Sequence, residues 1–134
     1  MVRLPRGAKL IAYYRVSNQK QGISTLGLSA QRKECSQFAK KNGYEIVEAY
    51  QEIESGRKSD RHRPQLKMAI AHAKQINATI VCAKLDRLTR NVSFLTMLLD
   101  SQVKFVALDV PEMQDPATTK MLLITLANIA EYEA

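Results

Sequence analysis

The sequence has no tryptophan, and its other aromatic residues are few: five tyrosines and three phenylalanines among 134 residues. The hydrophobic core must therefore consist mostly of aliphatic side chains, which a hydrophobic content of 46% supplies. A chain of this length and composition is expected to fold as one globular domain and is unlike a disordered tail.

Cysteines and long apolar runs are also scarce. Cys35 and Cys82 are the only cysteines, and two do not make the disulfide framework of a small secreted protein. Cys82 lies within an apolar run, which favours a small core residue. No apolar run approaches membrane-spanning length, and the basic residues 1–9 lack the apolar stretch of a secretory signal. We therefore expect a cytoplasmic protein with no membrane partner.

The usual patterns of metal and nucleotide sites are missing as well. The two histidines, His62 and His72, have no ligand spacing to one another or to the cysteines. No acidic cluster suggests paired magnesium ions, and no glycine-rich phosphate loop ends in Lys-Ser or Lys-Thr. The sequence favours a reaction that uses no metal, no ATP and no small-molecule cofactor.

Positive charge, in contrast, is in excess. Twenty lysines and arginines against 13 acidic residues give a formal net charge of +7. Such an excess favours polyanionic partners, because binding them releases counterions, although a basic but merely soluble surface is the alternative. The cations gather in two short stretches, which contain Arg57, Lys58, Arg61 and Arg63 in one and Lys84, Arg87 and Arg90 in the other.

Apolar runs alternate with amphipathic stretches along the chain. We expect strands at residues 10–14, 44–50, 79–83 and 104–108, and helices at residues 29–42, 64–75 and 92–101, with a final helix opening at Asp115-Pro116. Residues 18–28 and 52–63 contain glycines and many polar residues and are interpreted as loops. The alternation predicts an α/β fold of three layers, with a mostly parallel central sheet and helices on both faces.

The predicted helices differ in how they bury apolar side chains. The first, capped by Ser29 and ended by Gly43, would bury Ala30, Cys35, Phe38 and Ala39, and the second would bury Leu66, Met68, Ala69, Ile70 and Ala73. The final helix is apolar on more than one face between residues 121 and 130. One face can cover the sheet, and we interpret the rest as a self-association surface, with burial on several sides of one chain as the alternative.

Ser17 and Arg15 follow the first predicted strand. A lone serine at such a position is usually a turn or cap residue. Arg15, however, lies two residues away, so both side chains share a direction if the chain stays extended. Its guanidinium can hold a phosphate oxygen and lower the cost of forming an alkoxide. Ligands of parallel sheets bind at the carboxyl ends of the strands, where this pair is expected.

A second polar cluster follows the third predicted strand. Arg87 and Arg90 are three residues apart and share one face of a helical turn, next to Asp86. Arginines aimed at developing charge are the main catalytic device of phosphoryl transfer, while a solvated salt-bridge patch is the alternative. If the first and third strands are parallel neighbours, this cluster converges with Ser17 in an arrangement suited to attack on a phosphodiester.

A Ser-His-Asp hydrolase is a competing hypothesis for the same serine. Ser17, His62 and Asp86 would form its triad. The sequence lacks the glycine-flanked serine of such enzymes, and a hydrolase leaves the excess of arginine unexplained.

Three motifs in order resemble those of the serine recombinases, the resolvase/invertase family, and the resemblance runs from Leu10 to Glu133. Tyr14-Arg15-Val16-Ser17 looks like the family's Y-x-R-V-S-type strand end, and Gln21 and Gln31 fit the glutamines that follow it. Glu54-Ser55-Gly56 and Arg63-Pro64-Gln65-Leu66 resemble the middle motif and its R-P-x-L continuation. Residues 84–90 are close to the K-L-D-R-L-x-R signature.

The resemblance implies a site-specific DNA recombinase. Ser17 would attack the scissile phosphate and form a 5′-phosphoserine bond, so that strands are exchanged and resealed without ATP. Arg15, Arg63, Arg87 and Arg90 would stabilise the phosphate, Asp86 would position them or transfer a proton, and Gln21, Gln31, Ser55, Arg61 and Lys84 would contact the DNA. The Pro-Gln-Leu context favours Arg63 as the middle arginine, with Arg61 as the alternative.

The resemblance also implies the partners: DNA, and a homodimer that pairs into a tetramer through the final helix, in the bacterial cytoplasm at the nucleoid. Residues 1–134 would be the catalytic domain of a longer recombinase whose C-terminal DNA-binding part is absent here. The long stretch 22–28 looks more like the large-recombinase or transposon-borne branches. A catalytically silent relative and a basic α/β ligand-binding module are the competing classes, and retention of Ser17 with four arginines argues against silence.

Overall fold

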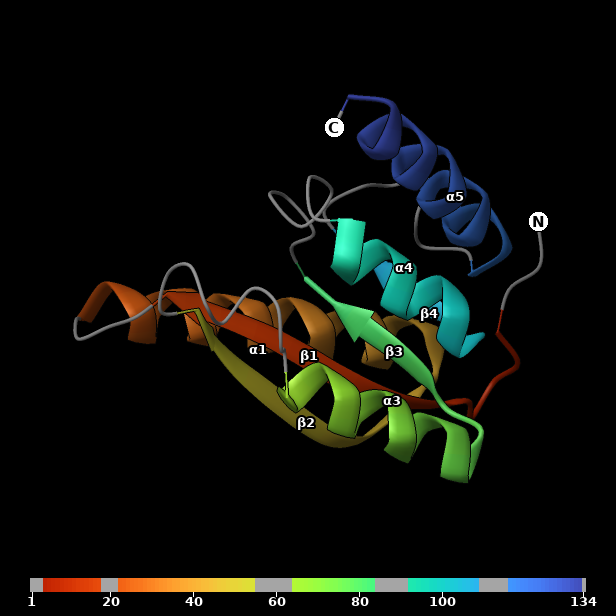
Figure 1. Cartoon of the computed structure of the whole chain (residues 1–134). Coiled ribbons are helices and arrows are strands. Elements are labelled where there is room, and N and C mark those ends of the chain that lie inside the picture. Colours follow the sequence, from red (N-terminus) through yellow and green to blue (C-terminus); the bar gives the residue numbers. More distant parts are fainter. Residues whose placement is uncertain (1–3, 18–21, 55–63, 84–91, 109–115, 134) are drawn as a thin grey trace.

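The computed structural model describes residues 4–17, 22–54, 64–83, 92–108 and 116–133. In chain order its elements are β1 (Lys9–Ser17), α1 (Gly22–Asn42), β2 (Glu45–Glu54), α3 (Pro64–Ile76), β3 (Thr79–Cys82), α4 (Val92–Ser101), β4 (Phe105–Ala107) and α5 (Pro116–Glu133) (Figure 1).

The strands of the described residues form one parallel sheet in the order β2-β1-β3-β4. This order confirms the predicted parallel sheet, and it makes the first and third strands direct neighbours. The register pairs Ala12 of β1 with Val81 of β3. Since all strands are parallel, their carboxyl ends lie along one edge, where ligands of such sheets bind.

Helices cover both faces of the sheet, as the alternating direction of strand side chains requires (Figure 1). On one face, Leu10, Ala12 and Tyr14 of β1 pack with Cys35 and Ala39 of α1. On the other face, Ile11 and Tyr13 of β1 pack against the apolar sides of α3 and α4. These sides include Leu66, Ala69, Ile70, Ala73 and Leu98. The three-layer α/β architecture predicted from the sequence is thereby confirmed.

The helix α5 packs against α4 and β4. It buries Leu123, whereas Met121 is 69% exposed and Ile124 is 42% exposed. Pro116 is its first residue, as predicted. Within the described residues, no helix has the length and apolarity needed to cross a membrane.

Two predicted loops were wrong in part. The helix α1 begins at Gly22, not at Ser29, so residues 22–28 are helical. Leu28 packs against the core cluster beneath α1, and this burial favours a helix despite the two glycines. The strand β2 continues to Glu54, beyond the predicted end at Tyr50, because it pairs with β1 along the whole length of that strand.

Two helical residues were also assigned to the wrong face. Ala30 of α1 is exposed, and Met68 of α3 is 52% exposed. Their neighbours Cys35, Ala39, Leu66 and Ala69 are buried as predicted. Alanine and methionine both tolerate exposed helical positions, so apolarity alone did not identify the buried stripe.

Three helices of the described residues end in a residue with left-handed backbone. Gly43 follows α1 with φ 75°, Asn77 follows α3 with φ 56°, and Gln102 follows α4 with φ 61°. After α1, the Tyr44 N–H donates to the Ala39 carbonyl at 2.8 Å, which satisfies a carbonyl that the helix leaves open. Gly43 therefore ends α1 as predicted.

Candidate active site at the carboxyl end of the sheet

The strand β1 projects beyond its neighbour β3. Arg15 and Ser17 pair with Glu52 and Glu54 of β2, whereas β3 ends at Cys82, one residue after the Ala12–Val81 pair. Arg15 and Ser17 thus occupy the carboxyl end of a central strand, the position at which this sheet type binds ligands. The strand was predicted to end at Tyr14, but its backbone continues through Ser17, which meets the condition set for Arg15 and Ser17 to share a direction.

Gln31 of α1 holds the backbone of Arg15. Its side-chain oxygen accepts a hydrogen bond from the Arg15 N–H at 3.1 Å, and its amide nitrogen donates to the Arg15 carbonyl at 2.7 Å. The same nitrogen donates to the Gly27 carbonyl at 3.3 Å. Gln31 is 7% exposed. This residue, predicted as a phosphate contact, is a buried link between α1 and β1.

Glu52 of β2 is a second buried polar residue at this end of the sheet, with 4% of its surface exposed. Its carboxylate accepts hydrogen bonds from the Tyr13 hydroxyl at 3.0 Å, the Gln65 N–H at 3.2 Å and the Leu66 N–H at 3.1 Å. The two N–H groups belong to the first turn of α3, where the helix dipole favours an anion. Glu52 therefore fixes the start of α3 against β1 and β2.

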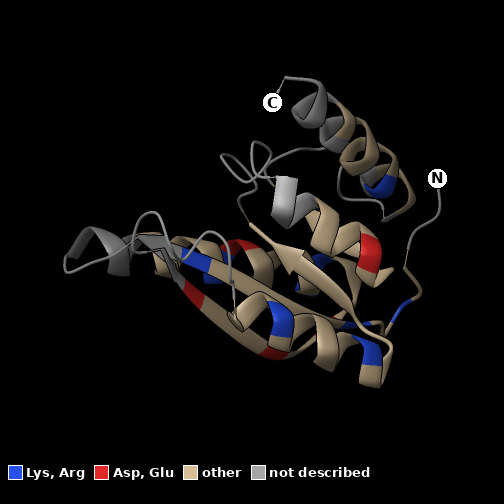
Figure 2. Ribbon diagram, viewed as in Figure 1, with Lys and Arg blue, Asp and Glu red and all other residues tan. Residues whose placement is uncertain are grey.

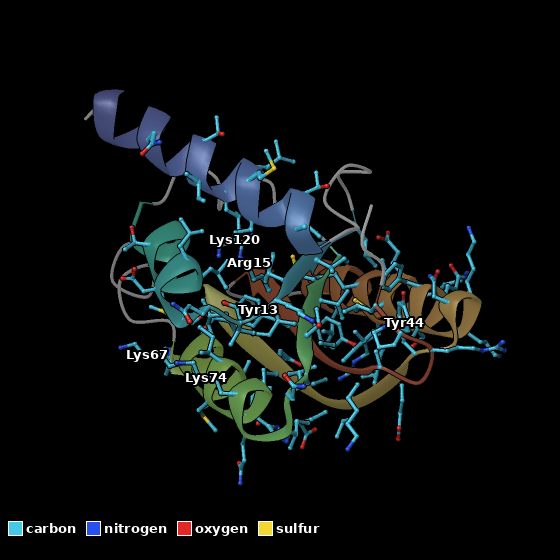
Figure 3. The ribbon with its side chains drawn as sticks, turned by 90° about the vertical axis from the view of Figure 1, so that its right-hand side faces the viewer. Tyr13, Arg15, Tyr44, Lys67, Lys74 and Lys120 are labelled. Atoms are coloured by element: carbon cyan, nitrogen blue, oxygen red, sulfur yellow. The ribbon has the colours of Figure 1, made fainter. Side chains whose placement is uncertain are left out.

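Glu52 also links the start of α3 to the strand that carries Arg15. The helix α3 begins at Pro64, and Glu52 lies opposite Arg15 in the sheet. Figure 3 shows Tyr13 and Arg15, which come from the same strand, together with the exposed Lys67 in the first turns of α3. The start of α3, which follows Arg63 directly in the sequence, is therefore tied to β1 through Glu52 and Tyr13.

Most of the predicted site residues lie outside the described residues. Arg15, Gln31 and the backbone of Ser17 are described, and the structure brings Arg15 and Gln31 into contact. The remaining predicted residues lie outside the described ranges; they are Gln21, Ser55, Arg61, Arg63, Lys84, Asp86, Arg87 and Arg90, together with His62 of the alternative triad. Their roles stay predictions.

Sequence reasoning missed Glu52 and Tyr13. Glu52 was interpreted as the first residue of an exposed loop, and Tyr13 as an ordinary strand residue. The hydrogen bond that joins them spans 39 residues, and no local pattern marks it.

Electrostatics argue against Cys35 and Tyr14 as nucleophiles. Burial raises the pKa of the Cys35 thiol to about 12, with a smaller contribution from Glu34. Burial and then Cys35 raise the pKa of Tyr14, while Arg32, whose guanidinium lies 6.0 Å from the ring centroid, opposes the shift. Both groups stay protonated at neutral pH, and a protonated thiol is a poor nucleophile.

Charged residues of both signs are spread over the described surface, with acidic positions on β2 and basic positions on α3 (Figure 2).

Among the described residues, no group of three or more His, Cys, Asp or Glu side chains is arranged to hold a metal ion.

Comparison with protein families gives a direct match. The sequence model described as the N-terminal domain of resolvase matches residues 10–134, nearly the whole chain. The chain belongs to the resolvase family. As a resolvase-family catalytic domain, it is a site-specific recombinase, an enzyme that acts on DNA. The resemblance inferred from the three sequence motifs is confirmed.

Solved structures support this resolvase assignment. The N-terminal catalytic domain of TP901-1 integrase is 25% identical, with a TM-score of 0.66, over 93% of this chain and 95% of that one. A resolvase family site-specific recombinase from Streptococcus pneumoniae is 26% identical, with a TM-score of 0.68, over 94% of this chain and 87% of that one. A comparison with curated proteins gives no match.

A third structure supports the fold alone. The C-terminal catalytic domain of ISC1926 TnpA, an IS607-like serine recombinase, is 21% identical, with a TM-score of 0.56. The match covers 88% of this chain and 79% of that one.

Proposed function

We propose that this resolvase-family domain cleaves and rejoins DNA with Ser17 as its nucleophile, through a 5′-phosphoserine intermediate and without metal or ATP. The observation that carries the proposal is the position of Arg15 and Ser17 at the carboxyl end of β1, the strand directly beside β3. The chain that leaves β3 supplies Asp86, Arg87 and Arg90.

The reach of the chain supports this combination. Cys82 ends β3 and lies at the level of Tyr13, one residue past the Ala12–Val81 pair. From that level, Ser17 is four residues along β1 and Asp86 is four residues beyond β3. Four residues span at most about 14 Å. The chain after β3 is therefore long enough for Asp86 to reach as far along the sheet as Ser17 does on β1.

The chemistry is a balanced transesterification. The Ser17 Oγ–P bond forms as the P–O3′ bond breaks, and the serine proton is in effect transferred to the leaving 3′-oxygen. Arg15, Arg87 and Arg90 neutralise the charge of the pentacovalent phosphorus, and Asp86 orients them or transfers the proton. Because the phosphoserine keeps the bond energy, the reverse attack by a new 3′-hydroxyl reseals a strand.

The remaining predicted contacts are assigned to phosphate and DNA binding. Arg63 directly precedes Pro64, where Glu52 holds the start of α3, and this anchoring supports Arg63 over Arg61 as the middle arginine. Gln21, Ser55 and Lys84 complete the set of DNA contacts.

We further propose that the domain acts as a homodimer that pairs into a tetramer on DNA, in the bacterial cytoplasm at the nucleoid. The exposed Met121 and Ile124 of α5 support a self-association surface. Sequence-specific binding would come from a separate DNA-binding domain of a longer recombinase.

The proposal is tested by trapping the covalent complex. The recombinase would be mixed with a supercoiled plasmid carrying the DNA that flanks its gene, stopped with detergent and digested with nuclease. Mass spectrometry is expected to find a nucleotide on Ser17. Ser17→Ala is expected to abolish the complex, whereas Ser36→Ala, which changes an exposed serine of α1, is expected to leave it intact. A complex that persists in Ser17→Ala protein would reject Ser17 as the nucleophile.

The same experiment separates the competing classes. A catalytically silent relative retains the DNA without any covalent adduct, and a ligand-binding module retains neither. A Ser-His-Asp hydrolase predicts loss of activity in His62→Ala protein, whereas the recombinase proposal predicts little change. Arg87→Lys should cripple cleavage, because lysine lacks the planar bidentate contact of arginine.

A further inference from the structure

The two backbone groups of Arg15 face the side chain of Gln31 rather than a neighbouring strand. In a parallel sheet, the N–H and C=O of one residue point to the same side of the strand. Both the N–H and the C=O of Arg15 form hydrogen bonds with the Gln31 side chain. The strand β3 ends at Cys82 and does not extend far enough to pair with Arg15. The primary amide offers one acceptor and one donor and so replaces the missing peptide of a partner strand.

The hydrogen-bond capacity of Gln31 limits what else it binds. A phosphate offers only acceptors, so Gln31 could contact it only through the two hydrogens of its amide nitrogen. That nitrogen already donates to the Arg15 carbonyl at 2.7 Å and to the Gly27 carbonyl at 3.3 Å. Both hydrogens are used, and the residue is almost fully buried.

We propose that Gln31 is a positioning residue that fixes the backbone at Arg15, and with it the path of β1 into Ser17, and that it does not bind phosphate. This inference rests on the proposed function of Ser17. It replaces the phosphate contact expected for Gln31 from the sequence. Gln31 couples α1 to the catalytic strand, so a displacement of α1 at Gln31 also displaces Arg15.

The test compares Gln31→Met with Gln37→Met. Methionine is similar in length to glutamine and retains the buried volume but offers no amide. Gln37 is exposed on the same helix and provides the matched control. Should Gln31→Met fail to fold, Gln31→Glu replaces it, because the carboxylate keeps an acceptor for the Arg15 N–H and removes both donors.

Two measurements distinguish positioning from phosphate binding. The first is the hydrogen-exchange rate of the Arg15 amide, which is expected to rise in Gln31→Met and to stay unchanged in Gln37→Met. The second is the rate of covalent complex formation at saturating plasmid DNA. We expect it to fall about 10- to 100-fold in Gln31→Met, as a small displacement of catalytic groups produces. Affinity for the flanking DNA, measured in a Ser17→Ala background, should not change.

Each contrary result has one meaning. Unchanged exchange at Arg15 in Gln31→Met rejects the backbone contact. A parental cleavage rate in Gln31→Met, with a complex that still depends on Ser17, rejects the positioning role and leaves the proposed function intact. Weaker DNA affinity with an unchanged saturated rate identifies Gln31 as a DNA contact. Absence of a Ser17 complex in the unmodified protein rejects the proposed function itself.

Discussion

At the level of single residues, Glu52 shows how a buried carboxylate is accommodated at the end of the sheet. Burying a carboxylate is unfavourable by several kcal/mol unless hydrogen bonds compensate. The Tyr13 hydroxyl and two N–H groups at the start of α3 supply three such bonds, and the helix dipole adds to them. Glu52 is therefore expected to stabilise the connection between β1, β2 and α3.

Glu52→Gln is predicted to lower the free energy of unfolding by about 2 kcal/mol, because glutamine offers one oxygen acceptor where three donors converge. Urea denaturation measures this change. The control is Glu45→Gln, an exposed glutamate of the same strand, for which little change is expected. Equal stability of the two variants would contradict the role given to Glu52.

Cys35 provides a prediction about pH. Burial raises the pKa of its thiol from 9.0 to about 12, so the folded protein holds this proton at a pH where the unfolded chain releases it. Stability contributed by Cys35 is fully present below pH 9.0 and is lost as the pH rises toward about 12. The decline is about 1.4 kcal/mol per pH unit at most.

The contribution of Cys35 is isolated with Cys35→Ala. Urea denaturation of both proteins from about pH 8 to about pH 10.5 should show the parental advantage shrinking above pH 9. Other titrating groups affect both proteins and cancel in the difference. A difference in unfolding free energy that stays constant with pH would show that the thiol titrates normally.

The candidate site was predictable where its residues follow a local rule. Arg15 and Ser17 follow an apolar run, and the rule for carboxyl ends of parallel strands places them correctly. Glu52 and Gln31 obey no local rule, because their partners are distant in sequence: Glu52 bonds Tyr13, and Gln31 bonds Arg15. Polar residues whose partners come from tertiary structure look like surface residues in the sequence alone.

At the level of elements, α1 shows where propensity was a poor guide. Glycines, serine and threonine between residues 22 and 28 suggested a loop. The segment is instead the first part of α1, and Leu28 at its end packs against the core. Tertiary packing outweighs weak helix propensity over so short a stretch. The starts of α3 and α5 were predicted correctly, because Pro64 and Pro116 mark them. The end of α1 was also predicted correctly, because Gly43 marks it.

Gly27→Ala tests the helical start of α1. A Cβ added at Gly27 meets no atom within 4 Å, and the residue is exposed. In a helix, alanine at this position should raise the free energy of unfolding by about 0.5–1 kcal/mol, because glycine loses more backbone entropy on folding. If residues 22–28 were a loop, the substitution would have no such benefit. Chemical denaturation measures the difference.

Gly43→Ala is predicted to have the opposite sign. Gly43 has φ 75°, and an added Cβ would lie 3.0 Å from Cγ of Arg6. The left-handed backbone alone costs alanine about 1 kcal/mol, and the contact with Arg6 adds to it. The same denaturation series measures both glycine variants. Stabilisation by Gly43→Ala would contradict the helix end described here.

At the level of the whole molecule, β3, the strand that precedes residues 84–90 in the sequence, lies directly beside β1, the strand that ends at Ser17. The periodicity of the sequence predicts parallel strands but does not dictate their order, so the convergence of Ser17 with residues 84–90 was stated as a condition. The order β2-β1-β3-β4 meets that condition for the strands themselves. The side chains of residues 84–90 lie outside the described residues and remain assigned by sequence alone.

The exposed face of α5 leads to a prediction about assembly. Met121 is 69% exposed on α5, and a hydrophobic side chain at such a surface favours contact with a second copy. Met121→Glu is predicted to weaken self-association at least about tenfold, as loss of a central apolar contact typically does. Sedimentation velocity over a range of protein concentrations measures the effect.

Met68 on α3 supplies the matched control for this experiment. It is also an exposed methionine, at 52%, but it belongs to a helix on the face of the sheet near β2. Met68→Glu carries the same change of charge and volume and is predicted to leave self-association unchanged. Equal weakening by both variants would mean that added negative charge, and not the surface of α5, governs the equilibrium. A change restricted to Met121→Glu would tie assembly to α5, the helix that packs on β4 at the opposite edge of the sheet from β2.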